Sequence, residues 1–120
     1  MNNGPTSNDR TKANPPNWPT IPEWLSDNPE AVFYFDETVK EMDRRVHLFP
    51  FDRYMIEILI VCLIHRQEYQ ERLSDATGDF KAELLDLIEQ TELTISTAQA
   101  ECLLPPNFGA RLIEQWKRVD

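Results

Sequence analysis

The sequence predicts an all-α protein, a small antiparallel bundle of three main helices plus a short C-terminal helix. Apolar residues recur at spacings of three and four over most of the chain after residue 28, which is the period of an amphipathic helix. The prolines fall at the boundaries between these stretches rather than inside them. At 120 residues the chain has the length of one domain.

The first part of the chain carries little that a core could bury. Residues 1–17 are rich in Asn, Pro, Gly, Ser and Thr, and we expect a disordered tail there. They contain no apolar stretch of the kind that a signal peptide needs. Prolines disfavour a helix in residues 18–27, which we interpret as an extended strap. Its apolar side chains, expected to lie over the core, are Trp18, Ile21, Trp24 and Leu25. The alternative is a Trp-bearing peptide that docks on a partner.

Residues 28–48 have the signals of a first helix. Asn28 suits the N-cap, Pro29 the first turn and Glu30 the positive end of the helix dipole. A heptad-like row follows at spacings of three and four: Val32, Phe35, Val39, Met42, Val46 and Phe49. Phe33 and Tyr34 lie off this row and indicate a second contact surface.

Residues 50–74 form the predicted second helix, which begins at Pro50. Its first half, YMIEILIVCLI at Tyr54–Ile64, is apolar on every side, and such a helix is buried on every side. A strand is the alternative for a short apolar run, but the helical flanks and the lack of a partner strand favour a helix. At about 16 Å this stretch is too short for a bilayer core of about 30 Å.

Residues 79–104 form the predicted third helix, for which Asp79 is a candidate cap. The β-branched residues of TELTIST predict a kink or break within it. Pro105 and Pro106 end the helix, and residues 107–118 then predict a short fourth one. Its inward residues are expected to be Leu112, Ile113 and Trp116.

A thin bundle leaves too little interior for the apolar second helix. Each large aliphatic side chain left in water forgoes about 1.5–3 kcal/mol, and large exposed apolar patches are unusual in monomers. We therefore expect a homo-oligomer held through the first two helices. The candidate interface residues are Phe33, Ile56, Leu59, Ile60 and Leu63. The alternative is a monomer whose strap and last helix complete the core.

The net charge of −9 argues against a general nucleic-acid footprint and against an anionic membrane surface. The charge is uneven, however, because residues 73–104 are strongly acidic and residues 105–120 are slightly basic. The candidate phosphate contacts are Arg44, Arg45, Arg53, Arg111, Lys117 and Arg118. Cations at the C-terminal end of a helix also have a simpler explanation, since they complement the helix dipole.

No catalytic or metal-binding pattern is found in the sequence. His47 and His65 have no partner at a metal-ligand spacing, and the three glycines form no phosphate-binding loop. Cys62 and Cys102 do not make a disulfide framework, and a buried reduced thiol is the interpretation we favour for Cys62 over a bridge. We expect a soluble cytoplasmic protein that is not an enzyme and needs no cofactor.

Two stretches of the chain resemble tailed-phage terminase small subunits. The first is IPEWLSDNPEAVFYFDETVKEM followed by HLFPFDRYMIEILIVCLIHRQEYQERL. Within it, Pro22, Trp24 and Leu25 match a Pro-x-Trp-Leu strap, and a Leu-x-Pro-x-Asp turn is matched by Leu48, Pro50 and Asp52. The second, LLPPNFGARL at residues 103–112, is similar to the segment that often closes those proteins.

The resemblance implies a non-enzymatic packaging factor in the cytoplasm of a bacterial host. Such subunits assemble into rings, recognise viral double-stranded DNA and regulate the large terminase subunit, which holds the ATPase and nuclease. The chain departs from the family in its acidity and in the short SDATGD connection between the second and third helices. The alternative function is a small acidic adaptor or regulatory protein that binds only protein partners.

Overall fold

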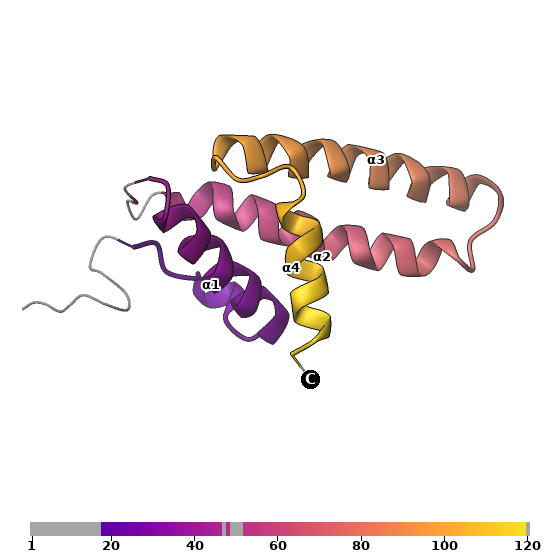
Figure 1. Ribbon diagram of the computed structural model, residues 1–120. Helices are drawn as coiled ribbons and strands as arrows, with labels where there is room; N and C mark the ends of the chain where they lie inside the picture. Colours follow the sequence, from indigo (N-terminus) through magenta and orange to yellow (C-terminus); the bar gives the residue numbers. More distant parts are fainter. Residues whose placement is uncertain (1–17, 47, 49–51, 120) are drawn as a thin grey trace, which may run out of the picture.

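The computed structural model describes residues 18–46, 48 and 52–119 (Figure 1). They form one short 3₁₀ turn and four α-helices without a strand, which confirms the all-α prediction. The elements are η2 (Glu23–Leu25), α1 (Pro29–Asp43), α2 (Arg53–Leu73), α3 (Gly78–Glu101) and α4 (Phe108–Lys117). The predicted tail (1–17), His47 and the Pro50 helix start lie outside the described residues. No described helix is both long enough and apolar enough to cross a membrane.

The predicted strap is only partly extended and only partly covers the core. The η2 turn begins directly after Pro22, a position at which proline does not obstruct a helical turn. Leu25 is buried and Trp18 packs against the core, and the Trp18 indole Nε1–H donates to Asp43 Oδ1 at 3.1 Å. Trp24 is 65% exposed, so the prediction that it lies over the core is wrong.

Helix α1 begins as the sequence predicts and ends five residues earlier than expected. The Asn28 side chain accepts a hydrogen bond from the Ala31 backbone N–H at 3.2 Å, which makes it the N-cap. The helix ends at Asp43 with Arg44 as its C-cap, whereas we expected it to continue to residue 48. Its buried face is wider than the predicted row and includes Tyr34 and Thr38.

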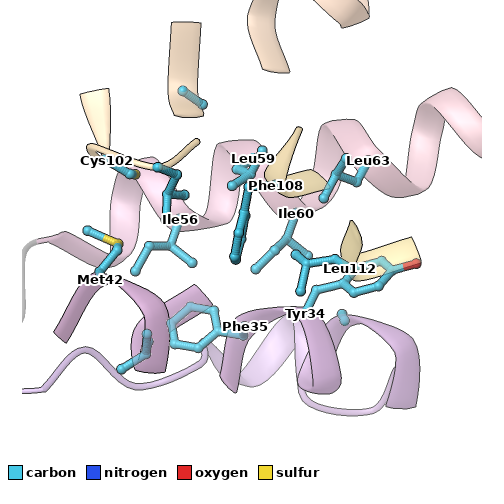
Figure 2. Close-up of a cluster of buried hydrophobic side chains, with 14 of the residues drawn as sticks. Tyr34, Phe35, Met42, Ile56, Leu59, Ile60, Leu63, Cys102, Phe108 and Leu112 are labelled. Atoms are coloured by element: carbon cyan, nitrogen blue, oxygen red, sulfur yellow. The ribbon is translucent and has the colours of Figure 1, made fainter. Parts of the chain in front are cut away.

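Helix α2 is covered from two sides by other parts of the same chain. One heptad-spaced row shares the side of α2 that carries Arg66, which pairs with Glu92 of α3 at 3.8 Å: Met55, Leu59, Cys62, Arg66, Tyr69 and Leu73. A second row contacts α1 and α4: Ile56, Ile60, Leu63 and Gln67. Figure 2 shows Phe108 of α4 pointing between Ile56 and Ile60 of this second row. These two rows explain why the apolar half of α2 tolerates almost no charge.

This arrangement corrects the oligomer interface expected from the sequence. The side chains of Ile56, Leu59, Ile60 and Leu63 have no exposed surface in the single chain. Phe33 is half-buried and lies 5.6 Å from the Trp116 ring of α4, measured between centroids. The contacts attributed to a second copy are therefore made within one chain, chiefly because α4 fills the groove between α1 and α2 (Figure 2).

Helices α2 and α3 form a long antiparallel hairpin whose far half extends beyond α1 and α4 (Figure 1). The row of α3 toward α2 has the same heptad spacing: Leu84, Ile88, Thr91, Ile95, Ala98 and Cys102. The break expected at TELTIST is absent, since α3 is continuous from Gly78 to Glu101. The hydroxyls of Thr91, Thr94 and Thr97 each donate to the backbone carbonyl four residues earlier, which satisfies them within the helix.

Candidate nucleic-acid interface

Cationic side chains gather where the C-terminal half of α1 runs beside α4. The two helices pack from Phe33–Trp116 at one end to Arg44 and Arg111 at the other. Between them lies a hollow of about 190 Å³. The residues that line it are Glu37, Lys40, Glu41, Arg44, Phe108, Arg111, Leu112 and Gln115. Phe108 and Leu112 are core residues, so the floor of the hollow is fixed by the packing that holds α4 in place.

Glu41 is the carboxylate around which the arginines are arranged. Its Oε2 lies 2.8 Å from Arg45 Nη2 and its Oε1 lies 3.3 Å from Arg44 Nη1. The hydrogen bond from Arg45 lowers the pKa of Glu41, and the charges of Arg44, Arg45 and Arg111 lower it further. Glu41 therefore stays ionised at neutral pH and neutralises part of the positive charge. The Arg44 side chain remains 74% exposed and available to a further anion.

A second, more open hollow of about 360 Å³ continues this cationic surface along α4. Its lining residues are Asn107, Ala110, Arg111, Glu114, Gln115 and Arg118. Arg111 belongs to both hollows, and its guanidinium lies 5.8 Å from the centroid of the Phe108 ring. Arg44, Arg111 and Arg118 thus form one continuous surface across two helices.

The remaining candidate phosphate contacts do not all join this surface. Arg45 is connected to it through Glu41, but its Nη1 also donates to the Leu103 carbonyl at 3.4 Å. Arg53 lines neither hollow; it lies 5.2 Å from the Tyr54 ring centroid and pairs with Glu57 at 3.6 Å. Lys117 pairs with Glu114 at 3.7 Å and also lies outside the hollows described here.

Two lining residues, Lys40 and Gln115, were missed in the sequence analysis. Lys40 precedes Arg44 by four residues, so the two share one face of α1. Gln115 follows Arg111 by four residues on α4 in the same way. Helical spacing from the candidate arginines would have identified both. What the spacing could not provide is the antiparallel pairing of α1 with α4.

The titratable groups away from this surface form neither a metal-binding cluster nor a reactive thiol within the described residues. Among the described residues no three His, Cys, Asp or Glu side chains group closely enough to hold a metal ion. Both thiols are free; burial raises the pKa of Cys62, and burial followed by the charges of Asp52 and Glu101 raises that of Cys102 to about 11. Cys62 is half-buried rather than buried as expected.

Comparisons of the chain with protein-family models, with curated proteins and with solved structures gave no match.

Proposed function

We propose that this chain is a non-enzymatic phage DNA-packaging factor of the terminase small-subunit kind. In this role it associates with copies of itself, contacts viral double-stranded DNA and regulates a large terminase subunit. The sequence resemblance described above is the basis of the proposal. Of the residues that carry the resemblance, Leu25, Leu48 and Leu112 are buried and hold the strap, the turn and the last helix on the core, whereas Trp24 is 65% exposed.

The observation that supports DNA contact is the cationic surface of α1 and α4 on a chain with a net charge of −9. Phosphate contacts supply most of the sequence-independent affinity of proteins for DNA, and Arg is well suited to them. Lys40, Arg44, Arg111 and Arg118 line two adjoining hollows along two packed helices, together with Glu37, Glu41 and Glu114. Lys40 pairs with Glu37 and Arg44 with Glu41, so the DNA contact is assigned chiefly to the exposed guanidinium groups of Arg44, Arg111 and Arg118.

Self-association is assigned to a third row on α2, which faces away from α1 and α4. Tyr54 and Ile58 are 59% and 42% exposed, Val61 is half-buried, and His65 ends the row. Arg53 and Glu57 beside this row pair with each other, and the exposed carboxylate of Glu68 follows three residues after His65. Two copies that pack through Tyr54, Ile58 and Val61 bury apolar surface at the end of the row away from Glu68.

The test of DNA contact is the salt dependence of binding to duplex DNA, measured by fluorescence anisotropy. The logarithm of the binding constant should fall linearly with the logarithm of salt concentration. The Arg44→Gln and Arg111→Gln variants should each weaken binding and reduce the slope by about one. Arg72→Gln is the matched control, because Arg72 is an exposed arginine in the last turn of α2, away from both hollows.

Two results would contradict the DNA part of the proposal. One is a slope near zero for the unmodified chain, and the other is an equal effect of Arg72→Gln and Arg44→Gln. Either result would favour the alternative function, an acidic adaptor that binds only proteins. That alternative is supported by the many exposed carboxylates of α3.

A further inference from the structure

The outward face of α3 combines exposed leucines with unpaired carboxylates. Leu85 and Leu93 are 49% and 65% exposed, and Ala82 and Ala100 lie exposed on the same side of the helix. In the described part of the chain, the helices that pack most closely on α3 are α2 and α4. Neither covers this outward side, because the buried row of α3 lies on the opposite one.

Acidic residues follow one another along this helix at spacings of four and three: Asp79, Glu83, Asp86, Glu89 and Glu92. Carboxylates at these spacings are neighbours on the helix surface and repel each other. Within the described residues only Glu92 has an ion-pair partner, Arg66 at 3.8 Å. Lys81 is the single cation of α3.

Helix α1 provides the contrast. Its Glu37 and Glu41 carboxylates pair with Lys40, Arg44 and Arg45 within the same segment. The chain therefore has local partners for its carboxylates where α1 meets α4, but not along α3. Exposed leucines interspersed with uncompensated charge of one sign form a surface that suits a partner of the opposite sign.

The charge decides which occupant fits. A second copy that packed through the same face would bring carboxylates against carboxylates, and a phosphate backbone would be repelled as well. We propose that the outward face of α3 docks a basic amphipathic helix of a protein partner. The partner's leucines contact Leu85 and Leu93, which lie about 12 Å apart along the axis with Glu89 between them, four residues from each. One Lys or Arg of the partner pairs with Glu89 between these two contacts, and another pairs with Asp86 beside them.

This docking surface goes beyond the proposed DNA contact and does not depend on it. The probe is a fluorescein-labelled synthetic peptide of about 20 residues, with Leu at helical spacings of three and four and Lys elsewhere. The control peptide keeps the leucines and has Glu in place of Lys. Binding of the full chain to each peptide is measured by anisotropy in the absence of DNA.

The Lys peptide should bind and the Glu peptide should not. The Asp86→Lys/Glu89→Lys variant and the Leu85→Ser/Leu93→Ser variant should each weaken binding by about tenfold or more. The matched control is Glu68→Lys/Glu71→Lys, which reverses two exposed carboxylates of α2 and should change the affinity less than about twofold. Circular dichroism checks that every variant retains its helix content.

Three results would overturn the proposal. The first is absence of binding to the Lys peptide. The second is an equal loss in the Glu68→Lys/Glu71→Lys control, which would show that the peptide senses only the net charge of the chain. The third is unchanged affinity after Leu85→Ser/Leu93→Ser, which would remove the two leucines from the contact.

Discussion

Gln99 of α3 and Gly109 of α4 are joined by a hydrogen bond that fixes the last helix to the hairpin. The Gly109 backbone N–H donates to Gln99 Oε1 at 2.8 Å, and Gln99 Nε2 donates to the Pro106 carbonyl at 2.8 Å. The Gln99 side chain is buried and thus satisfies two backbone groups of the α3–α4 connection. Because α4 carries Phe108 and Arg111 and is followed by its C-cap Arg118, this clamp positions both the core and the cationic surface.

Gln99→Leu should lower the free energy of unfolding by about 1–3 kcal/mol, because it leaves the Gly109 N–H and the Pro106 carbonyl without partners. The measurement is urea unfolding followed by circular dichroism. Gln90→Leu, on an exposed position of the same helix, should change the value by less than about 0.5 kcal/mol. Equal effects of the two substitutions would show that the clamp adds no stability.

Gly109→Ala should destabilise the chain by about 1–3 kcal/mol. A Cβ at residue 109 would lie 2.7 Å from Leu63 Cδ2 and 3.0 Å from Gln99 Oε1. Without that clash, replacing a helical glycine by alanine would stabilise the helix by about 0.5–1 kcal/mol. The sign of the change in stability therefore shows whether the clash outweighs the helix propensity of alanine. Thermal unfolding gives that sign, and a raised melting temperature would contradict the close approach of α4 to α2.

Tyr34→Phe should change how stability depends on alkaline pH. Burial of Tyr34 raises its pKa well above the ordinary value, and the hydrogen bond that its hydroxyl donates to Glu30 Oε2 at 2.6 Å raises it further. Unfolded tyrosine ionises near pH 10 while the folded phenol keeps its proton. The contribution of the protonated Tyr34 phenol to the free energy of unfolding is therefore fully present below about pH 10. It is lost as the pH rises further, by up to about 1.4 kcal/mol per pH unit.

The Phe variant lacks this ionisation, so its stability should fall less steeply above about pH 10. At neutral pH it should be less stable by about 1–3 kcal/mol, because the Glu30 carboxylate keeps only its hydrogen bond from Gln67 at 2.8 Å. Urea unfolding of both proteins at a series of pH values makes the comparison. Parallel curves from neutral to alkaline pH would contradict the role assigned to the buried phenol.

The neighbours Ile58 and Leu59 should respond in opposite ways to an acidic substitution. Ile58 is 42% exposed whereas Leu59 is fully buried. Ile58→Glu should leave the helix content intact and reduce the native mass measured by light scattering, because it places charge in the proposed self-association row. Leu59→Asp should unfold the chain, because a carboxylate would be buried without a partner.

Leu93→Glu is the control for this pair, since it adds a carboxylate to an exposed leucine of α3 outside the row. It should leave the native mass unchanged. A monomeric unmodified chain at every concentration would show that the α2 row does not mediate self-association.

The burial of α2 could be predicted from sequence, whereas the elements that cover it could not. A helix that is apolar on every side is expected to be covered on every side, and Ile60 indeed has no exposed surface. Tyr54 and Ile58 are 59% and 42% exposed, however, so the prediction is correct for two rows of α2 and wrong for the third. The pattern does not show whether the cover belongs to the same chain. We assigned the cover to a second copy and kept a monomer completed by the strap and last helix as the alternative; Phe108 and Leu112 of the last helix fill that groove (Figure 2).

The break expected in α3 illustrates a second limit. β-branched residues lower helix propensity, but the threonine hydroxyls are satisfied by carbonyls of their own helix, and packing against α2 outweighs the small loss. At the candidate site the sequence provided Arg44, Arg111 and Arg118 by charge alone. Arg44 lies near Arg111 and Arg118 because α1 packs against α4. This tertiary contact cannot be predicted from the spacing of residues within either helix.

The order of the helices along the chain has a consequence for biosynthesis. Helix α4 follows the three longer helices, and ten residues are too few for a helix that is stable before it docks. A nascent chain that has folded as far as α3 therefore presents Ile60 and Leu63 to the solvent as an open apolar groove. During that interval the groove is a target for chaperones and for mispairing between unfinished chains, and its closure depends on the arrival of Phe108 and Leu112.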